Sequence, residues 1–321
     1  MLSRRELIKS LIAAGGLALV PLAWAKETRY GGVRIGVQSA SFTYSGMGID
    51  GIIKTMSDVG LGEIDCMSEH VENYLGAPVP LPGTGRPGPW VQRTTPVRPA
   101  GSRGRGRGPG RGFAFGMDPA KREALRKWRL EVDLDKFRHV GKLFTDAGLT
   151  FFSYNLSFDD TFTDEEIEKG FQMTKALGTR IITASSPVSI FPRLAPFAEK
   201  HDVIVAMHNH INGPEEFAEA MKASKNIWVN LDVGHFFASG YDPIAYIEEH
   251  HDRITNLHIK DRKKNNGPSV PFGQGDTPLK QILLLLRDRK YDLLCCIEDV
   301  AEIGPAADLK QCLDYCKGVL S

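Results

Sequence analysis

The sequence reads VIVAMHNH at residues 203–210, IWVNLDVGH at 227–235 and ITNLHIKD at 254–261, and these three stretches decide the fold. Each begins with a mainly apolar run and ends in histidine, aspartate or both. Apolar runs of this length are typical of parallel strands that are buried on both faces. The polar residues follow each run directly, at the position where a strand ends and a loop begins. The stretches therefore predict parallel strands whose carboxyl ends carry functional side chains.

The same pattern extends along the chain from residue 33 onward. Amphipathic helical patterns separate the apolar runs; Leu279, Ile282, Leu283 and Leu286, for example, follow the spacing i, i+3, i+4, i+7. Strands are expected at 33–38, 62–66, 149–154, 180–184, 203–207, 227–231, 254–258 and 292–297. Eight strands that alternate with helices predict an α/β fold of the (β/α)8 TIM-barrel class, with a doubly wound open sheet as the alternative.

The composition excludes several other classes of protein. Of the 321 residues, 42% are hydrophobic and 25% are charged, which is ordinary for a globular chain. Wholesale disorder, a collagen-like repeat and a polytopic membrane protein are therefore excluded. The 40 Lys and Arg residues nearly balance the 39 Asp and Glu residues. The charges are unevenly distributed along the chain, because residues 86–129 hold ten Arg and two Lys against only Asp118 and Glu123.

The basic segment 86–129 interrupts the alternation of strands and helices. Its middle, GSRGRGRGPGRG at 101–112, contains nothing from which a core is built and is expected to be disordered. Its end, 118–131, predicts a helix that begins at Asp118-Pro119 and packs back on the barrel. The segment follows the second strand, so we interpret it as a solvated insertion on a loop at the carboxyl face. A lid over an anionic substrate and a polyanion-binding arm are the alternatives.

Residues 1–25 are set apart from the fold. The motif SRRELIK at 3–9 precedes an apolar run at 11–22 and the small-x-small end Ala23-Trp24-Ala25. This pattern resembles a twin-arginine signal peptide and predicts export to the periplasm or the cell exterior, followed by cleavage. A retained membrane anchor is the alternative, but the apolar run is shorter than the roughly 20 residues of a spanning helix. The remaining chain, 26–321, is expected to form one domain.

Polar side chains follow four consecutive predicted strands, and in a barrel these strand ends converge on one face. The side chains are His208, His210, Asp232, His235, His258, Lys260, Asp261 and Glu298. Histidine nitrogen together with carboxylate oxygen suits a divalent ion such as Mn, Zn, Co or Mg and does not select among them. His208 and His210 lie two residues apart and would point the same way from an extended strand end. One of them is a candidate ligand and the other a candidate substrate contact.

These residues resemble the motifs of the xylose isomerase-like TIM-barrel superfamily, which includes sugar phosphate isomerases and epimerases. The matching segments are DVGH at 232–235, HIKD at 258–261, GQGD at 273–276 and Glu298 on the last strand. The resemblance covers about 33–321 outside the basic segment. It implies one divalent metal ion held by a residue of strand five, which we assign to His208, together with Asp232, His258 and Glu298. It also implies that His235 contacts a substrate oxygen.

The chain departs from that superfamily at one point. Many of its epimerases carry a glutamate at the end of strand five that is both ligand and base, whereas this chain has His208-Asn209-His210 there. The expected chemistry is proton abstraction beside a metal-polarised carbonyl, with Glu298 as base and Lys260 or a histidine as acid. The reaction is then the isomerisation or epimerisation of a free or oxidised (keto) sugar. Because one glutamate is lacking, dehydration or β-elimination of a keto sugar is the alternative.

The remaining expectations concern the substrate and other partners. Asp65 near the end of the second strand, Asn155 after the third, Asp261 and His210 are candidate substrate contacts. The expected partner is a small carbohydrate; we expect no physiological nucleic acid and no membrane once the signal is cleaved, and the sequence leaves room for a homo-oligomer. An apurinic-endonuclease-like phosphodiesterase would require about three metal ions and more ligands on the early strands than the chain supplies. A non-catalytic sugar-binding barrel is the last alternative.

Overall fold

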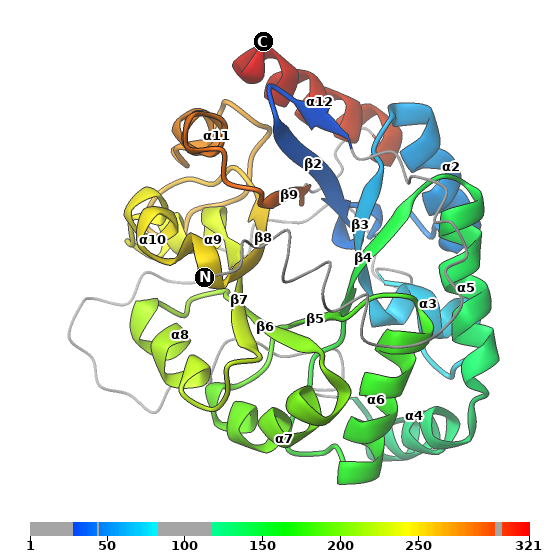
Figure 1. The fold of residues 1–321 in the computed structure, drawn as a ribbon. Coiled ribbons are helices and arrows are strands. Elements are labelled where there is room, and N and C mark those ends of the chain that lie inside the picture. Colours follow the sequence, from blue (N-terminus) through cyan, green and yellow to red (C-terminus); the bar gives the residue numbers. More distant parts are fainter. Residues whose placement is uncertain (1–27, 44, 83–116, 299–303) are drawn as a thin grey trace.

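A closed barrel of parallel strands forms the centre of the molecule in the computed structural model, which describes residues 28–43, 45–82, 117–298 and 304–321 (Figure 1). Its strands are β2 (Val33–Gln38), β3 (Glu63–Met67), β4 (Thr150–Asn155), β5 (Ile181–Ala184), β6 (Ile204–His208), β7 (Ile227–Asp232), β8 (Ile254–Ile259) and β9 (Leu294–Ile297). Neighbours pair in chain order, and β2 pairs with β9 to close the ring. The predicted TIM barrel is confirmed, and the open sheet is wrong. A short antiparallel strand, β1 (Arg29–Tyr30), precedes the barrel.

Helices surround the barrel and connect its strands (Figure 1). The α-helices are α2 (Ile49–Val59), α3 (Ser68–Tyr74), α4 (Pro119–Glu131), α5 (Leu134–Asp146), α6 (Asp164–Ala176), α7 (Phe191–His201), α8 (Pro214–Met221), α9 (Val233–Ala238), α10 (Pro243–His250), α11 (Leu279–Arg289) and α12 (Pro305–Leu320). Short 3-10 turns lie at Ser39–Phe42, Val188–Ile190 and His251–Arg253. Helix α11 buries Leu279, Ile282, Leu283 and Leu286, the four residues whose spacing predicted it.

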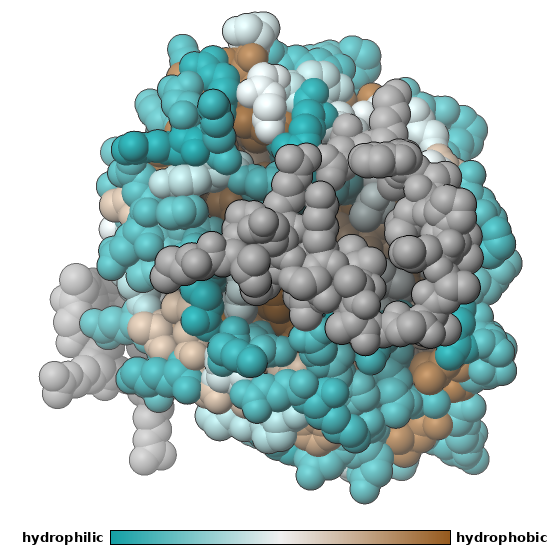
Figure 2. All heavy atoms as spheres, in the orientation of Figure 1, coloured by the Kyte–Doolittle hydropathy of each residue, from teal (hydrophilic) through white to brown (hydrophobic). Residues whose placement is uncertain are grey.

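The hydrophobic core fills the barrel and the layer between strands and helices. Every residue of β8 and β9 is buried, as the apolar runs predicted for strands covered on both faces. Burying a single Leu, Ile, Val or Phe side chain contributes about 1.5–3 kcal/mol, so this layer supplies most of the driving force for folding. In the view of Figure 2 the described surface is mainly hydrophilic, with apolar residues in separate groups. No helix within the described ranges is both long and apolar enough to span a membrane.

Helix α4 is the described end of the basic segment. Asp118 caps it by accepting hydrogen bonds from the backbone N–H groups of Ala120 and Lys121, and Pro119 occupies its first turn. Leu125 is buried against Ala77 and Val79 in the segment after α3, and Trp128 packs against both this cluster and the main core. The helix predicted at 118–131 is therefore confirmed. Residues 83–116, which contain the expected disordered stretch, and the predicted signal at 1–25 lie outside the described residues.

The strand register places the ends of neighbouring strands, from β6 to β9, within two residues of one another. His208 pairs with Asn230, Asp232 with His258, and Ile259 with Ile297. Since the strands are parallel, their carboxyl ends all open on the same face of the barrel. The polar residues that follow the four apolar runs are therefore gathered at one end of the molecule.

Candidate active site and metal centre

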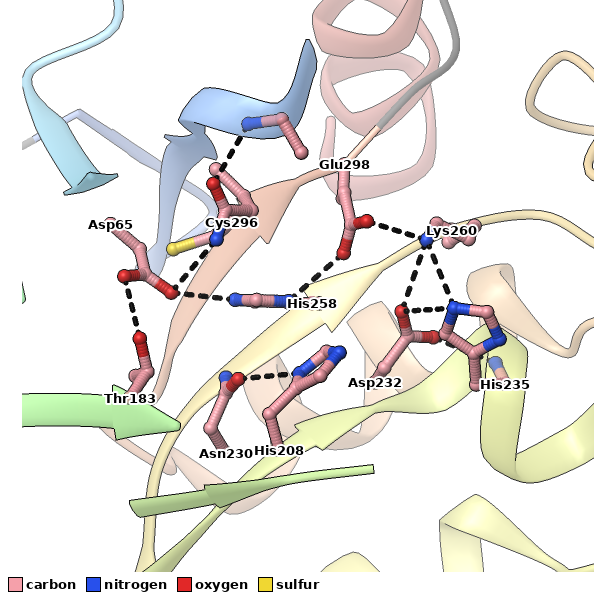
Figure 3. Close-up of polar contacts among 12 residues, drawn as sticks. Asp65, Thr183, His208, Asn230, Asp232, His235, His258, Lys260, Cys296 and Glu298 are labelled. Carbon is pink, nitrogen blue, oxygen red and sulfur yellow. Dashed lines mark hydrogen bonds and ion pairs between the residues drawn. The ribbon is translucent and has the colours of Figure 1, made fainter. Parts of the chain in front are cut away.

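Four side chains from four neighbouring strands converge on one point (Figure 3). They are His208 on β6, Asp232 on β7, His258 on β8 and Glu298 directly after β9, and we refer to them as the β6–β9 cluster. Each offers one ligand atom, and these atoms all lie within 4.8 Å of one another. The first three residues are buried and Glu298 is half-buried. The structure thus brings together the four residues that the sequence analysis assigned to a metal ion.

An acceptor holds one ring nitrogen of each histidine in the β6–β9 cluster. The Nδ1 atom of His208 lies 2.7 Å from Asn230 Oδ1. Asn230 donates its amide N–H to the carbonyl of Asn256, which turns its oxygen towards the ring. The Nε2 atom of His258 lies 2.7 Å from Asp65 Oδ2. Each of these contacts turns the other ring nitrogen, His208 Nε2 or His258 Nδ1, towards the cluster, as in metal-binding histidines. Burial acts to lower the pKa of His258, but Asp65 and Glu298 outweigh it and raise that pKa to about 9, so its ring gives up a proton when it binds a metal ion.

Asp65 contacts protein groups with both of its carboxylate oxygens. It is fully buried, and its second oxygen, Oδ1, accepts a hydrogen bond of 2.8 Å from the Thr183 hydroxyl. Gln38 lies 3.4 Å from the oxygen that also contacts His258. All of its neighbours are therefore protein groups that fix its direction. In this structure Asp65 orients His258, and its expected contact with a substrate stays a prediction.

The ligand atoms of the cluster fit a divalent cation. Asp232 Oδ2, His258 Nδ1 and Glu298 Oε2 are buried and have no hydrogen-bond partner among the described residues. His258 Nδ1 and Glu298 Oε2 lie 3.0 Å apart but do not adopt hydrogen-bonding geometry. A buried polar atom without a partner costs about 1–3 kcal/mol, so three around one point call for a group that satisfies them together. Two imidazole nitrogens and two carboxylate oxygens form a typical donor set for Zn or Mn.

Lys260 lies against the two carboxylates of the cluster. Its Nζ atom is 2.6 Å from Glu298 Oε1 and 3.3 Å from Asp232 Oδ2. Burial acts to lower the pKa of Lys260, but Glu298 and Asp232 outweigh it and raise that pKa. Burial likewise opposes ionisation of Glu298, but Lys260 and His258 hold its pKa well below the usual range. Lys260 is thus an ammonium and Glu298 a carboxylate at neutral pH.

His235 and His210 lie beside the cluster. His235 Nε2 is 3.2 Å from Lys260 Nζ, and the backbone N–H of His235 donates to Asp232 Oδ1 over 2.7 Å. The ring centroid of His210 is 4.9 Å from that of His208 and 4.9 Å from that of His235. Burial and the charge of Lys260 lower the pKa of His210 to about 4 and hold that of His235 well below its usual value. Both rings are therefore neutral at physiological pH.

Asp261 does not belong to this group of side chains. Its carboxylate accepts hydrogen bonds from the backbone N–H groups of Gly273 (2.8 Å), Gly275 (2.9 Å) and Thr277 (3.3 Å). A Cβ atom at Gly275 would lie 1.8 Å from Asp261 Oδ1, so only glycine allows this approach. The GQGD segment is thus a loop held by Asp261, and the expected contact of Asp261 with a substrate stays a prediction.

Asn155 lines a pocket at the ends of β3 and β4 whose lining includes no member of the β6–β9 cluster. We call this the α4 pocket; its lining residues are Ser68, Glu69, Glu72, Leu125, Arg129, Asn155, Ser157 and Phe162. Glu69 is buried there, its carboxylate accepts a hydrogen bond from the Ser68 hydroxyl, and burial raises its pKa. The lining is mostly polar, and an amide, hydroxyls and a carboxyl are groups that hydrogen-bond sugar hydroxyls.

Sequence reasoning missed two residues of this region. Asn230, which holds His208, lies inside an apolar strand, and a polar residue at a buried strand position was the available signal. Arg262 contacts His235 Nδ1 over 2.6 Å and directly follows the HIKD segment, at which the sequence analysis stopped. Both act on histidines that the sequence analysis did identify. Supporting residues of this kind escape a search for ligand-type residues at strand ends.

The chain is similar to known proteins of one family. The profile of the family described as xylose isomerase-like TIM barrel matches residues 110–317. An inosose dehydratase from Clostridium tetani (strain Massachusetts / E88) is 27% identical over 137 residues, which are 36% of this chain and 45% of that protein. This match spans less than half the length of that relative.

Solved structures share the fold at low sequence identity. The IOLI protein, solved with a binding zinc atom, has a TM-score of 0.58 and 15% identity, over 89% of this chain and 98% of that one. An L-ribulose 3-epimerase has a TM-score of 0.56 and 15% identity, over 90% of this chain and 94% of that one. At these identities the likeness concerns the fold alone.

Proposed function

The chain belongs to the xylose isomerase-like TIM-barrel family, and from this premise we propose that it is a divalent-metal-dependent isomerase or epimerase of a free or oxidised sugar. The observation that carries the proposal is the β6–β9 cluster, in which four ligand atoms lie within 4.8 Å and three of them lack a hydrogen-bond partner. Proteins similar to this chain include a dehydratase and an epimerase.

The metal ion would be held by His208, Asp232, His258 and Glu298. When bound, such an ion supplies a Lewis acid that polarises a carbonyl group. Two residues outside the cluster orient its histidines: Asn230 and Asp65 turn the second ring nitrogen of His208 and of His258 inward. These contacts are made by buried groups, so the ligands are oriented before any ion arrives.

Glu298 is the proposed base. Contact with Lys260 keeps its carboxylate ionised, and an ionised carboxylate is able to accept a proton. The same contact lowers the proton affinity of the carboxylate. The C–H bond that it breaks must therefore be acidified, as it is in the position next to a carbonyl group. This requirement favours a keto or aldehydo sugar over a sugar without a carbonyl.

Lys260 and His235 are the proposed proton donors, and both lie beside Asp232. Lys260 Nζ and His235 Nε2 lie 3.3 and 3.6 Å from Asp232 Oδ2, so both converge on one region of the site. Proton removal next to a carbonyl leaves negative charge on oxygen, and donors in a water-poor site stabilise that charge strongly. The two residues would hold the substrate oxygen and return a proton to it.

A lyase is the second candidate, and the end of β6 favours it. Epimerisation requires a base on each face of the reacting carbon, whereas β6 ends in His208 and not in glutamate. His210 is neutral in this environment and offers at most a weak second base. Dehydration needs one base and one acid, which Glu298 with Lys260 or a histidine would supply. The similarity to an inosose dehydratase points in the same direction.

We further propose that the protein acts outside the cytoplasm. The support is the SRRELIK motif and apolar run at residues 3–22, which resemble a twin-arginine signal. Sugar phosphates are scarce in that compartment, so a sugar without phosphate is the proposed substrate. The partner is accordingly a small carbohydrate.

The test combines metal analysis with a substrate screen. Mature protein (26–321) purified without chelator is expected to hold close to one divalent ion per chain, and Asp232→Ala to lose it. Keto sugars are then incubated in D2O and followed by proton NMR. Isomerase or epimerase activity incorporates deuterium next to the carbonyl, whereas lyase activity yields an unsaturated product. Protein without bound metal, or an Asp232→Ala variant with unchanged metal content, would contradict the proposal.

A further inference from the structure

The histidines of the site differ in the kind of group that holds them. His208 and His258 each contact an acceptor, Asn230 Oδ1 and Asp65 Oδ2 respectively. His235 contacts a donor: the Nη1 atom of Arg262 lies 2.6 Å from His235 Nδ1. In a neutral imidazole one nitrogen donates and the other accepts, and the partner of one nitrogen decides the role of the other. His235 is therefore held in the opposite sense to the two histidines of the cluster.

The guanidinium of Arg262 can only donate hydrogen bonds and is charged at neutral pH. Nδ1 of His235 must then be the acceptor, and the proton of the neutral ring lies on Nε2. Burial, Lys260 and His210 hold the pKa of His235 well below its usual value, in agreement with a ring that carries a single proton. Nε2 is also the nitrogen that faces Lys260 and Asp232 (Figure 3).

We propose that Arg262 is a positioning residue that fixes His235 in the Nε2–H tautomer and thereby makes it a hydrogen-bond donor, not a base, towards a substrate oxygen. The part that concerns substrate rests on the proposed function; the tautomer itself does not. The assignment separates the histidines by role, since those beside acceptors turn a nitrogen towards the metal position and the one beside Arg262 presents a proton to the substrate.

Arg262 is itself held in place by its loop. Its Nε and Nη2 atoms donate to the carbonyl of Gly267 over 3.1 and 2.6 Å, and its backbone N–H donates to Thr277 Oγ1 over 3.0 Å. The backbone N–H of Asn266 in turn donates to the carbonyl of Ala238, at the end of the helix that carries His235. The planar guanidinium has little freedom to turn away, because opposite edges of it are occupied.

Lys260 is a second cation in contact with the ring of His235. Its Nζ atom lies 3.2 Å from His235 Nε2, and an ammonium also only donates. A neutral imidazole satisfies one of these two cations, and the shorter contact belongs to Arg262. The Lys260 protons then turn to Glu298 and Asp232, which lie 2.6 and 3.3 Å away. Nε2–H and the ammonium form a pair of donors beside Asp232, where a substrate oxygen that gains negative charge would be stabilised.

The tautomer is measured by NMR on the 15N-histidine-labelled wild-type protein at neutral pH. Long-range proton–nitrogen spectra distinguish a protonated ring nitrogen from an unprotonated one, and His235→Gln identifies the signals. We expect Nε2 of His235 protonated and Nδ1 unprotonated, both before and after the addition of zinc. A protonated Nδ1 in the wild-type protein overturns the proposal without any need for a variant to fold.

The variants Arg262→Gln and Thr277→Val separate positioning from loop structure. A glutamine amide both donates and accepts, so Arg262→Gln should give a mixture of tautomers, bound metal unchanged and kcat/KM on the keto sugar about 10–100-fold lower. Arg262→Lys, which keeps a donor, should restore the Nε2–H tautomer. Thr277→Val removes a loop contact without touching the guanidinium and should leave the tautomer as it is. The proposal fails if Arg262→Gln leaves the tautomer unchanged, or if Thr277→Val alters it equally. If the tautomer behaves as expected but no keto sugar reacts, the proposed function fails and the positioning role stands.

Discussion

Two regions at the carboxyl ends of the strands bury charged side chains, and they differ in how those charges are matched. Between α3, α4 and α6, the buried residues Glu72, Arg122, Arg129 and Glu166 form what we call the α4 clamp. Arg129 contacts both oxygens of Glu72 (2.7 and 3.0 Å) and one of Glu166 (3.0 Å). Arg122 takes the other Glu166 oxygen over 2.6 Å. Every carboxylate oxygen of the clamp is thus paired.

The β6–β9 cluster leaves three of its ligand atoms without hydrogen bonds, although three of its four residues are buried as deeply as those of the clamp. The contrast teaches that burial of charge does not by itself mark a functional site. A set whose carboxylate oxygens are all paired by arginines, such as the α4 clamp, fixes a helix on the barrel. A set with several unpartnered ligand atoms around one point is suited to bind a cation. The two regions should therefore respond in opposite ways to substitution.

The largest expected effect is the loss of turnover in Glu298→Gln. The amide keeps the shape of the side chain but cannot accept the proton, and losing a general base lowers kcat by about 10²–10⁴-fold. The matched variant Glu69→Gln lies in the α4 pocket, where loss of one hydrogen bond should raise KM only about 2–10-fold. Both are measured by steady-state kinetics, with metal content determined for each. Equal losses of kcat in the two variants would mean that Glu69 takes part in catalysis as much as Glu298 does. The assignment of the reaction to the β6–β9 cluster would then be wrong.

The next largest effect is expected in the α4 clamp, on stability. Arg129→Met leaves the buried carboxylate of Glu72 without its cation and removes one of the two arginines that contact Glu166, which costs about 3–5 kcal/mol in the free energy of unfolding. Arg138→Met breaks an exposed pair with Asp135 and should cost less than about 1 kcal/mol. Urea unfolding followed by circular dichroism gives both values. If Arg129→Met is as stable as Arg138→Met, the clamp does not hold α4 as the geometry indicates.

A smaller effect is expected for the support of the cluster. Asp65→Asn keeps the size of the side chain but replaces an obligate acceptor beside His258 with an amide, and such changes lower metal affinity about 10–100-fold. Zinc titration against a competing chelator measures the change. Thr183→Val, which removes a partner of Asp65 but keeps its charge, is the matched control and should have a milder effect. Unchanged affinity in Asp65→Asn would contradict the role of Asp65 in orienting His258.

The barrel and the four residues of the β6–β9 cluster could be predicted from the sequence. The physical reason is the same in both cases. Apolar runs such as 227–231 identify strands, and parallel strands bring whatever follows them to one face. The roles of Asp65 and Asp261 could not be read in this way. A carboxylate that faces a substrate and one that accepts hydrogen bonds from His258 or from the N–H of Gly273 have the same place in the pattern. Only side-chain direction separates them. The α4 clamp depends on contacts between residues 57 positions apart, for which the sequence carries no signal.

The smallest expected effect concerns His70, which lies on the same side of the barrel as the α4 clamp. It is buried on α3, 3.2 Å from the Ser39 hydroxyl, and burial lowers its pKa from 6.5 to about 4. The folded protein therefore resists protonation more than the unfolded chain does, so this residue's contribution is complete above pH 6.5 and is lost as the pH falls towards 4. Between pH 7 and pH 5 the loss is about 2 kcal/mol. Other buried histidines add to the acid sensitivity of the wild-type protein, so the measured quantity is the difference between wild type and His70→Gln in urea unfolding at the two pH values. His70→Gln should lose about 2 kcal/mol less than the wild type; equal losses would mean that His70 is protonated in the folded protein and that its burial is relieved by local opening.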